Sequence, residues 1–546
     1  MDNFLDQIAV AQINVIIGDI DGNCQKIVSN IELAKTQNKK LIIFPELSIC
    51  GYPPHDLLHF DSFVEKCNKG LQTILPFTQD IYVIVGLPSV NKNNWGKKLH
   101  NSAVVLYNQK IIQTVHKTLL PDYDVFDEYR YFEPNTNFEP VEILNTKVGL
   151  TICEDIWMFN DKPLYNLNPV KELVNKGAKI IINIAASPFD FNHREKRISI
   201  LQRNAAKFKS PIVYVNHAGA QNDLVFDGGS MVLDAAGSLL YEASYFEESL
   251  SICDLTSSQS SDISIAQSKN ERISQALVCG IRDYFRKCGF KDAVLGLSGG
   301  VDSALVAVLA VEALGAEHVH PVLMPSAFSS EHSIQDALEL CELNGLKSRT
   351  IPINNIYDKF LNELTPSFEG KPFDIAEENV QSRTRGTILM ALSNKHRYVL
   401  LNTSNKSELA VGYGTLYGDM AGGLSVIGDL YKTEVYALCD HLNSTRIRIP
   451  QNILTKAPSA ELRPGQKDSD SLPDYDLLDR ILFHHIEGKL GSSSMIEMGF
   501  DPEVVSKVLS LVSRSEYKRF QFAPIIRVST KAFGTGRRYP LVASYS

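Results

Sequence analysis

The sequence lacks the features of a membrane, secreted or nucleic-acid-binding protein. No apolar run within its 546 residues reaches the roughly 18 residues that a membrane-spanning helix needs. Asp2 and Asp6 interrupt the apolar stretch that a signal peptide would need, and the following "IAVAQINVIIGD" is typical of a strand. No basic tract offsets the net charge of −9, which argues against a nucleic-acid partner. We therefore expect a soluble globular protein whose partners include neither membrane nor nucleic acid.

The cysteines also lack a pattern. There are nine of them, an odd number, and they are scattered along the chain with no C-x-x-C spacing. Disulfide frameworks and structural zinc sites both need paired or closely spaced cysteines. The sequence therefore predicts reduced thiols in a cytoplasmic protein, with neither disulfides nor structural zinc.

The chain is too long for a single hydrophobic core, so we expect at least two domains. In the first half, helical patterns such as "NCQKIVSNIELAKTQN" alternate with β-branched runs of strand length, which indicates an α/β layer structure. These runs are "LIIFPEL", "YVIVGLP", "VGLTICED", "KIIINIAAS" and "PIVYVNH". Beyond a serine-rich stretch, the elements follow the order of a doubly wound parallel sheet. We predict one domain over 1–253, a linker over 254–270 and a second domain over 271–546.

A glycine-rich loop joins a strand to a helix near the start of the second domain. Gly299 and Gly300 let the backbone turn tightly, so that its N–H groups and two serine hydroxyls can surround a phosphate. The lysine of a Walker loop is absent, and Asp302, an acceptor beside phosphate, is suited to hold magnesium. The alternative is that this segment is a glycine-rich turn without chemical function. The predicted ATP-binding residues of the loop are Gly296, Leu297, Ser298, Gly299, Gly300, Val301, Asp302 and Ser303.

The segment "SGGVDS" resembles the pyrophosphate loop of the N-type ATP pyrophosphatases, which split ATP into AMP and pyrophosphate. Four later segments, in order and spacing, resemble the NAD synthetases of that group. They are "EENVQSRTRG", "LLNTSNKSELAVGYGTLYGDMAGGLSVIGDLYKTEV", "KAPSAELRPGQKDSDSLPDY" and "EYKRFQFAPIIRVS". This resemblance implies ATP, Mg²⁺ and deamido-NAD as ligands of the second domain.

The same resemblance implies roles for individual residues. Those expected at ATP are Thr403, Lys432 and Ser459, and those expected at deamido-NAD are Asn379, Arg383 and Lys518. Glu408 would either share the magnesium ion with Asp302 or contact the dinucleotide. Taken singly, these residues have ordinary explanations: "NTSNKSEL" could cap a helix, and Lys432 could be a solvated side chain.

Three separated segments of the first domain carry groups suited to amide hydrolysis. "IIFPELSICGY" places Glu46 after a strand, "VHKTLLPDYDVFDEYRYF" carries Lys117, and "VGLTICEDIWM" places Cys153 at a strand end. A carboxylate to take the thiol proton, a cation for the oxyanion and a thiolate nucleophile suffice for this chemistry. In isolation, such a cysteine more often packs in a core, such a glutamate caps a turn, and such a lysine is solvated.

Together these segments, with "NIAASPF" and "NHAGAQNDLVFDGGS", resemble the nitrilase superfamily, whose fold is an α-β-β-α sandwich. The resemblance implies that Glu46 is the general base and that Cys153 attacks the side-chain amide of glutamine. It also implies that Lys117 and the N–H of Glu154 stabilise the oxyanion, with Glu128 as a supporting carboxylate.

The resemblance further places Tyr123 and Ser187 against the bound glutamine. Many relatives have a lysine six residues after that serine, where this chain has His193 followed by Arg194. We favour Arg194 for the α-carboxylate of glutamine, because its guanidinium fork matches a carboxylate. The choice between His193 and Arg194 stays open.

A nitrilase-type domain joined to this second domain resembles the glutamine-dependent NAD synthetases over nearly the whole chain. That resemblance implies an enzyme that adenylates the nicotinate carboxylate of deamido-NAD and amidates it with ammonia from glutamine. We also expect a closed passage for ammonia and a homo-oligomer. One alternative is an amidase for another amide with a degenerate ATP domain, and another is a non-catalytic nucleotide-binding protein.

Overall fold

The computed structural model of the protein describes residues 2–158, 164–252 and 267–543. The chain divides into two compact units, Met1–Gln267 and Ser268–Ser546. Most of the linker predicted over 254–270 lies outside the described residues. None of the helices in the described ranges is both long and apolar enough to cross a membrane.

The first unit is built on two six-stranded sheets, in the orders β14-β1-β2-β3-β4-β5 and β13-β12-β9-β8-β7-β6. The strands of the first sheet are β1 (Ile8–Gln12), β2 (Leu41–Ile43), β3 (Tyr82–Val90), β4 (Leu99–Tyr107), β5 (Lys110–His116) and β14 (Ser249–Ile252). Those of the second are β6 (Val141–Ile143), β7 (Thr146–Ile152), β8 (Ile180–Ile184), β9 (Ile212–Val215), β12 (Met231–Leu233) and β13 (Leu239–Glu242). A short ribbon of β10 (Ala218–Gln221) and β11 (Leu224–Asp227) completes the unit.

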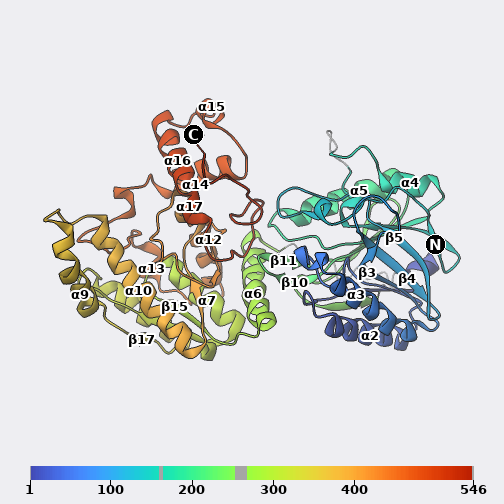
Figure 1. The fold of residues 1–546 in the computed structure, drawn as a ribbon, viewed down its shortest axis with the longest axis horizontal. Coiled ribbons are helices and arrows are strands. Elements are labelled where there is room, and N and C mark those ends of the chain that lie inside the picture. Colours follow the sequence, from blue (N-terminus) through green and yellow to red (C-terminus); the bar gives the residue numbers. More distant parts are fainter. Residues whose placement is uncertain (1, 159–163, 253–266, 544–546) are drawn as a thin grey trace. The chain divides into compact units, whose positions relative to one another are not determined.

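The inner strands β1, β2, β8 and β9 are buried on both faces, which explains why most of them read as apolar runs in the sequence, whereas the edge strands β5 and β13 are exposed or half-buried over most of their length. In β1, Ile8 and Val10 belong to the core between the sheets, whereas Ala9 and Ala11 belong to the core under the helices. The covering helices are α2 (Ile20–Thr36) and α3 (Asp61–Ile74) on the first sheet, and α4 (Pro169–Asn175) and α5 (His193–Phe208) on the second. Figure 1 shows α4 and α5 on one side of the strands and α2 on the other. The predicted α-β-β-α sandwich is confirmed.

The second unit contains a five-stranded sheet in the order β17-β16-β15-β18-β19, in which every pairing is parallel. Its strands are β15 (Ala293–Gly296), β16 (Val319–Leu323), β17 (Arg349–Thr350), β18 (Val399–Asn402) and β19 (Leu424–Ser425). After β15 the chain adds β16 and β17 on one side of it, and then adds β18 and β19 on the other side. The loop after β15 therefore lies at a topological switch point, where open α/β sheets bind ligands. The predicted doubly wound parallel sheet is confirmed.

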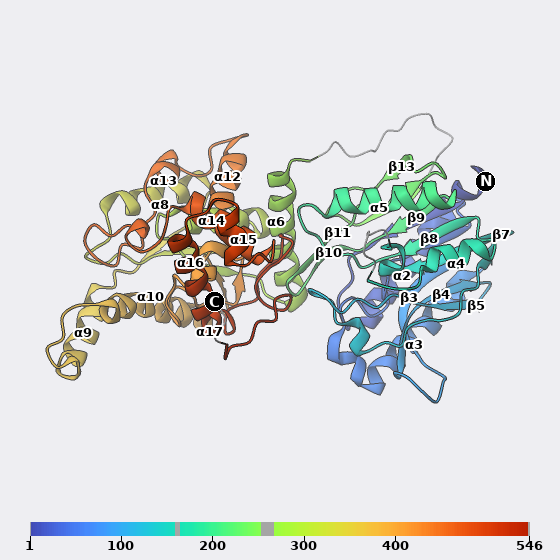
Figure 2. The same ribbon diagram turned by 90° about the horizontal axis from the view of Figure 1, so that it is seen from above.

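Helices surround this sheet and form a further helical layer toward the C-terminus, which Figure 2 shows from above. The helices before β19 are α6 (Lys269–Cys288), α7 (Val301–Leu314), α8 (Glu331–Leu343), α9 (Asn354–Leu364), α10 (Ile375–His396) and α11 (Lys406–Val411). Those after it are α12 (Lys432–Asn443), α13 (Gln451–Thr455), α14 (Tyr475–Ile486), α15 (Ser492–Glu497), α16 (Pro502–Arg514) and α17 (Glu516–Arg519). Apolar residues of α11, α14 and α16 share one core, so the C-terminal helices fix the position of α11.

Candidate active sites

Cys153 lies at a sharp turn directly after β7. It begins the 3-10 helix η4 (Cys153–Ile156) with a left-handed φ of 43°, which residues other than glycine rarely adopt. The side-chain amide of Asn183 donates to its carbonyl oxygen at 3.3 Å. Burial raises the pKa of the thiol well above its ordinary value, and the nearby Glu46 adds to the shift. The thiol is therefore protonated at neutral pH and needs a base to become a nucleophile.

Glu46, Lys117 and Glu128 form a buried cluster in the same unit. The Nζ atom of Lys117 lies 2.7 Å from Oε1 of Glu46 and 2.7 Å from Oε1 of Glu128. Burial alone would lower the pKa of Lys117, but Glu128 and Glu46 outweigh it and hold that pKa well above its usual value. Burial raises the pKa of Glu128 to about 7 despite the attraction of Lys117. The cluster thus holds a permanent cation between two carboxylates.

Asp155 connects the lysine segment to the cysteine segment. Its Oδ1 accepts from the backbone N–H groups of Thr118 at 2.9 Å and Leu119 at 2.8 Å. Its Oδ2 accepts from the N–H of Ile152 at 3.0 Å. Burial raises the pKa of Asp155 to about 7, opposed by these backbone donors. Asp155 therefore fixes the backbone after Lys117 relative to the backbone before the nucleophile.

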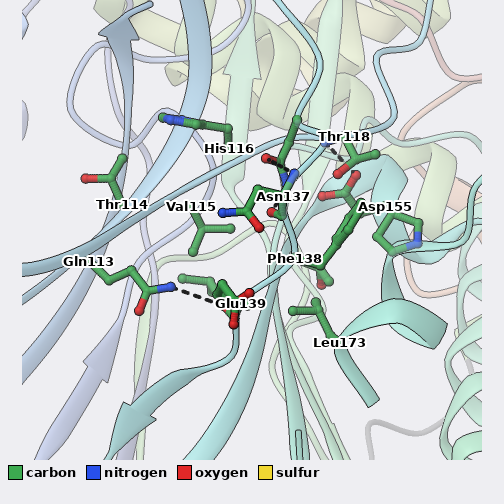
Figure 3. Close-up of a pocket in the computed structure, with 14 residues that line it drawn as sticks. Gln113, Thr114, Val115, His116, Thr118, Asn137, Phe138, Glu139, Asp155 and Leu173 are labelled. Carbon is green, nitrogen blue, oxygen red and sulfur yellow. Dashed lines mark hydrogen bonds between the residues drawn. The ribbon is translucent and has the colours of Figure 1, made fainter. Parts of the chain in front are cut away.

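A cavity of about 170 Å³ adjoins Asp155 and Thr118 (Figure 3). Its remaining wall consists mainly of neutral amides and apolar side chains, including Gln113, Asn137 and Phe138. None of the three residues predicted for catalysis lines it within the described part of the chain. The cavity is therefore not assigned to catalysis.

The residues predicted to contact glutamine have partners within the protein. The hydroxyl of Tyr123 donates to the carboxylate of Glu154 at 2.9 Å, and the hydroxyl of Ser187 lies 2.7 Å from Nε2 of His193. Arg194 directs its guanidinium to the buried Glu242, with Nε at 2.9 Å and Nη2 at 2.7 Å. The structure thus brings Ser187 and His193 together, whereas the guanidinium group of Arg194 pairs with Glu242.

In the second unit, the glycine loop turns tightly at Gly299. Gly299 has φ of 79°, and a Cβ there would lie 2.1 Å from the carbonyl oxygen of Ser333, so only glycine fits. The N–H of Gly300 donates to Oγ of Ser298 at 3.2 Å, and the hydroxyl of Ser303 donates to the Gly300 carbonyl oxygen at 3.1 Å. The loop leads into the N-terminus of α7, which supplies free N–H groups for an anion.

Asp302, Glu408 and Lys432 form a charged cluster beside that helix terminus. The Nζ of Lys432 lies 2.5 Å from Oδ2 of Asp302 and 3.7 Å from Oε1 of Glu408, and the side-chain amide of Asn405 donates to Oδ1 of Asp302 at 2.9 Å. Burial and the charge of Asp302 raise the pKa of Glu408 to about 8, against the attraction of Lys432. Two carboxylates therefore face a single cation at the edge of the glycine loop.

Three residues predicted at deamido-NAD converge on one loop, residues 412–416. Asn379 accepts from the hydroxyl of Thr415 at 2.6 Å, and Nε of Arg383 donates to the carbonyl oxygen of Leu416 at 3.2 Å. The Nζ of Lys518 donates to the carbonyl oxygens of residues 412 and 414 at 2.8 and 2.7 Å. Burial lowers the pKa of Lys518. The structure gathers side chains that are far apart in the sequence around this loop.

The other two residues predicted at ATP are Thr403 and Ser459. Thr403 directly follows β18, so it lies at the same sheet edge as the glycine loop. The hydroxyl of Ser459 donates to the carbonyl oxygen of Gln466 at 2.6 Å within a loop. Their contact with ATP stays a prediction.

Comparison with known proteins assigns each unit to a family. A carbon–nitrogen hydrolase model matches residues 7–263, and an NAD synthase model matches residues 273–522. The glutamine-dependent NAD(+) synthetase of Synechocystis sp. is 46% identical over 98% of this chain and 99% of its own length. That of Acinetobacter baylyi is 42% identical over 98% of each chain.

The chain belongs to the glutamine-dependent NAD(+) synthetase family.

Solved structures of glutamine-dependent NAD(+) synthetases agree with this assignment. The enzyme from Acinetobacter baumannii, in complex with ADP, is 39% identical over 98% of each chain, with a TM-score of 0.77. The enzyme from Cytophaga hutchinsonii has a TM-score of 0.83 over 98% of this chain and 97% of its own, and at 22% identity it supports the fold alone. In this chain, each family match falls within one of the two compact units.

Sequence reasoning missed two buried residues that contact the carboxylates of the synthetase's first unit. The side-chain amide of Asn101, in β4, donates to Glu46 and Glu128, and the hydroxyl of Tyr52 donates to Oε1 of Glu128 at 2.9 Å. Asn101 lies between His100 and Ser102, before the apolar run of its strand, and is 1% exposed. A polar amide within a buried strand was the signal that could have singled it out.

Proposed function

We propose that the chain converts deamido-NAD to NAD, with ATP as energy source and glutamine as nitrogen donor, releasing AMP, pyrophosphate and glutamate. The observation that carries this proposal is that each unit holds a full set of reactive groups. The first has Cys153 with the buried cluster of Glu46, Lys117 and Glu128. The second has a glycine loop at a sheet switch point, flanked by Asp302 and Glu408.

In the first unit, Glu46 takes the thiol proton of Cys153, and the sulfur attacks the side-chain amide carbon of glutamine. Lys117 and the N–H of Glu154 stabilise the oxyanion that forms. The C–N bond then breaks, and Glu46 returns the proton to the leaving ammonia. Water, activated by the same carboxylate, hydrolyses the thioester and releases glutamate. The permanent charge of Lys117 suits it to the oxyanion, because it does not depend on a proton transfer.

In the second unit, a nicotinate carboxylate oxygen of deamido-NAD attacks the α-phosphorus of ATP and pyrophosphate leaves. The loop N–H groups and the N-terminus of α7 hold the departing pyrophosphate, and Lys432 offsets its charge. Ammonia then attacks the acyl carbon of the adenylate, and AMP leaves. The loop around residues 412–416, with Asn379, Arg383 and Lys518, supports the deamido-NAD side.

Asp302 and Glu408 fit a magnesium ion on their geometry. Both carboxylates are 17% exposed and face the same ammonium group, so the position already selects a cation. Mg²⁺ usually takes one or two protein carboxylates, with water and substrate phosphates completing its shell. This fits a pair of carboxylates better than a larger cage, and no group of three or more ligating side chains occurs within the described ranges. When bound, the ion would neutralise charge that develops on the phosphates.

Glutamine labelled with ¹⁵N at the side-chain amide tests the whole reaction. With ATP, magnesium and deamido-NAD present, we expect the label in the carboxamide of NAD, with AMP and pyrophosphate formed in equal amounts. Mass spectrometry of NAD and chromatography of the nucleotides measure both. Formation of ADP, or of glutamate without NAD under any condition, would contradict the proposed function and favour an amidase with an inactive ATP domain.

The residue that binds the α-carboxylate of glutamine is resolved by a second test. His193 lies against Ser187, and although burial alone would raise the pKa of Asp190, the hydrogen bond from His193 brings it to about 2. Because Glu242 already occupies the fork of Arg194, we expect His193→Ala to raise the KM for glutamine about tenfold and Arg194→Ala to raise it less. Steady-state glutaminase assays give both constants. The opposite ranking would assign the carboxylate to Arg194.

We also propose a cytoplasmic homo-oligomer. The cysteines of the described part of the chain are all free, as a reducing compartment requires. Light scattering coupled to size-exclusion chromatography measures the number of chains in the assembly.

A further inference from the structure

Asn101 links the two carboxylates of the first unit through one amide group. Its Nδ2 donates to Oε1 of Glu46 at 2.6 Å and to Oε2 of Glu128 at 3.3 Å. Its backbone carbonyl oxygen accepts from the N–H of Lys117 at 2.8 Å. The Nζ of Lys117 pairs with the same two carboxylates. Asn101 and Lys117 therefore close a ring with Glu46 and Glu128, in which each carboxylate meets one ammonium group and one amide.

The orientation of this amide follows from its neighbours. An ionised carboxylate can accept hydrogen bonds but cannot donate them. The group of Asn101 that faces the two carboxylates is therefore its NH₂ group. The Oδ1 atom is then turned away, and it is buried without a hydrogen-bond partner in the described part of the structure. An unsatisfied buried acceptor costs free energy, and a residue kept for stability alone would satisfy both ends of its amide. The arrangement points to a role in the reaction.

The two oxygens of Glu46 are held unequally. Oε1 accepts from both Lys117 and Asn101, whereas Oε2 accepts from the backbone N–H of Ala186 at 2.9 Å. The oxygen with fewer donors keeps the freer lone pair and is the better proton acceptor. Asn101 thus distinguishes the two oxygens of the general base.

We propose that Asn101 is a positioning residue of the glutaminase reaction: it fixes Oε1 of Glu46, so that Oε2, which is held by one backbone N–H, takes the thiol proton, and it keeps Glu128 separate from Glu46. This proposal rests on the proposed roles of Glu46 and Cys153. It predicts that Asn101 acts through the proton affinity of the base rather than through glutamine binding.

The effect on pH follows from the loss of two donors. A hydrogen bond to an ionised carboxylate stabilises it, so removing the donor raises its pKa. Glu128 has a pKa of about 7 with the amide in place, so the pair is close to binding a proton. Besides its own Lys117, Glu46 and Glu128, the titratable groups that interact electrostatically with this ring are Cys153, Tyr52, Glu154 and Asp155. Without Asn101, a proton enters the ring at higher pH and blocks the base.

The test compares Asn101→Leu and Asn101→Asp with a matched control, Asn23→Leu. Asn23 is also buried, and its amide donates to the carbonyl oxygens of Ile16 and Ile49, away from the ring. Glutamine hydrolysis is measured as kcat and KM across pH in the full-length protein, together with the rate at which iodoacetamide alkylates Cys153. Thermal unfolding followed by circular dichroism reports the stability of each variant.

For Asn101→Leu we expect kcat to fall about tenfold or more at pH 7, with KM nearly unchanged. The acid limb of the profile of kcat against pH, where activity rises with pH, should move up by about one pH unit. Asn101→Asp keeps the side-chain shape and adds a third carboxylate, so the acid limb of its pH profile should move further up. This variant also tests the proposal if the leucine variant does not fold. Asn23→Leu should lose stability, but the acid limb of its pH profile should stay where it is in the wild type. If both Asn101 variants keep the wild-type pH profile, the positioning role is refuted. Glu46→Gln tests the role of Glu46 as the base separately from the role of Asn101. Glutaminase activity retained in that variant would refute Glu46 as the base.

Discussion

Replacing Cys153 with alanine is expected to reduce glutamine-dependent NAD formation to background while ammonia-dependent formation continues. No thioester can form without the sulfur, so no ammonia is released from glutamine. The substitution removes one buried sulfur atom, which costs a small fraction of the stability of a domain. Activity with added ammonium should rise with pH, because uncharged ammonia is the nucleophile. NAD formation by the purified variant, with each nitrogen source in turn, measures both activities.

Cys67→Ala is the matched control for that experiment. Cys67 is a fully buried cysteine of α3, packed in the core under the helices, and belongs to no candidate site. It should keep both activities, apart from a modest loss of stability. Glutamine use retained by the Cys153 variant would remove this thiol from the mechanism. Loss of both activities in a folded Cys153 variant would contradict the division of labour between the two units.

The sequence predicted the positions that depend on strand ends. Cys153 follows β7 directly, Glu46 follows β2 by three residues, and the glycine loop follows β15. Each is marked locally by an apolar run that ends at or shortly before it, so the local sequence places it at a strand end, whereas its role came from the family resemblance.

Pairings between side chains from distant elements were beyond the sequence. The pairing of Lys432 with the carboxylate of Asp302, 130 residues away in the chain, had no signal in the sequence, and its contact with ATP phosphates stays a prediction. The pairing of the Arg194 fork with Glu242 had none either, and the contact of Arg194 with glutamine also stays a prediction. Asn101 carried no motif. Such contacts are set by how sheets and helices pack, and no local pattern encodes a partner that arrives from another element.

Replacing Asp302 with asparagine or Glu408 with glutamine is expected to lower adenylation about a hundredfold or more. Each variant keeps the side-chain shape and removes a negative charge that would hold magnesium against the ATP phosphates. Lys432 would also lose a partner, and the charge on its side chain, which is 3% exposed, would then be less compensated. Release of AMP and pyrophosphate in the presence of deamido-NAD measures the step, and titration with magnesium should show a raised requirement for the ion.

Glutamine hydrolysis should persist in both variants, because Cys153 and its base belong to the other unit. The matched control is Asp283→Asn, a buried carboxylate of α6 that pairs with Arg286 and Lys287 outside the glycine loop. It should lower stability without changing the magnesium requirement. Because the pKa of Glu408 is about 8, a bound cation should favour its ionised form, and magnesium affinity should rise with pH through that range. Glu408→Gln should abolish this pH dependence. Near-normal AMP formation in both the Asp302 and Glu408 variants would exclude these carboxylates as the magnesium site.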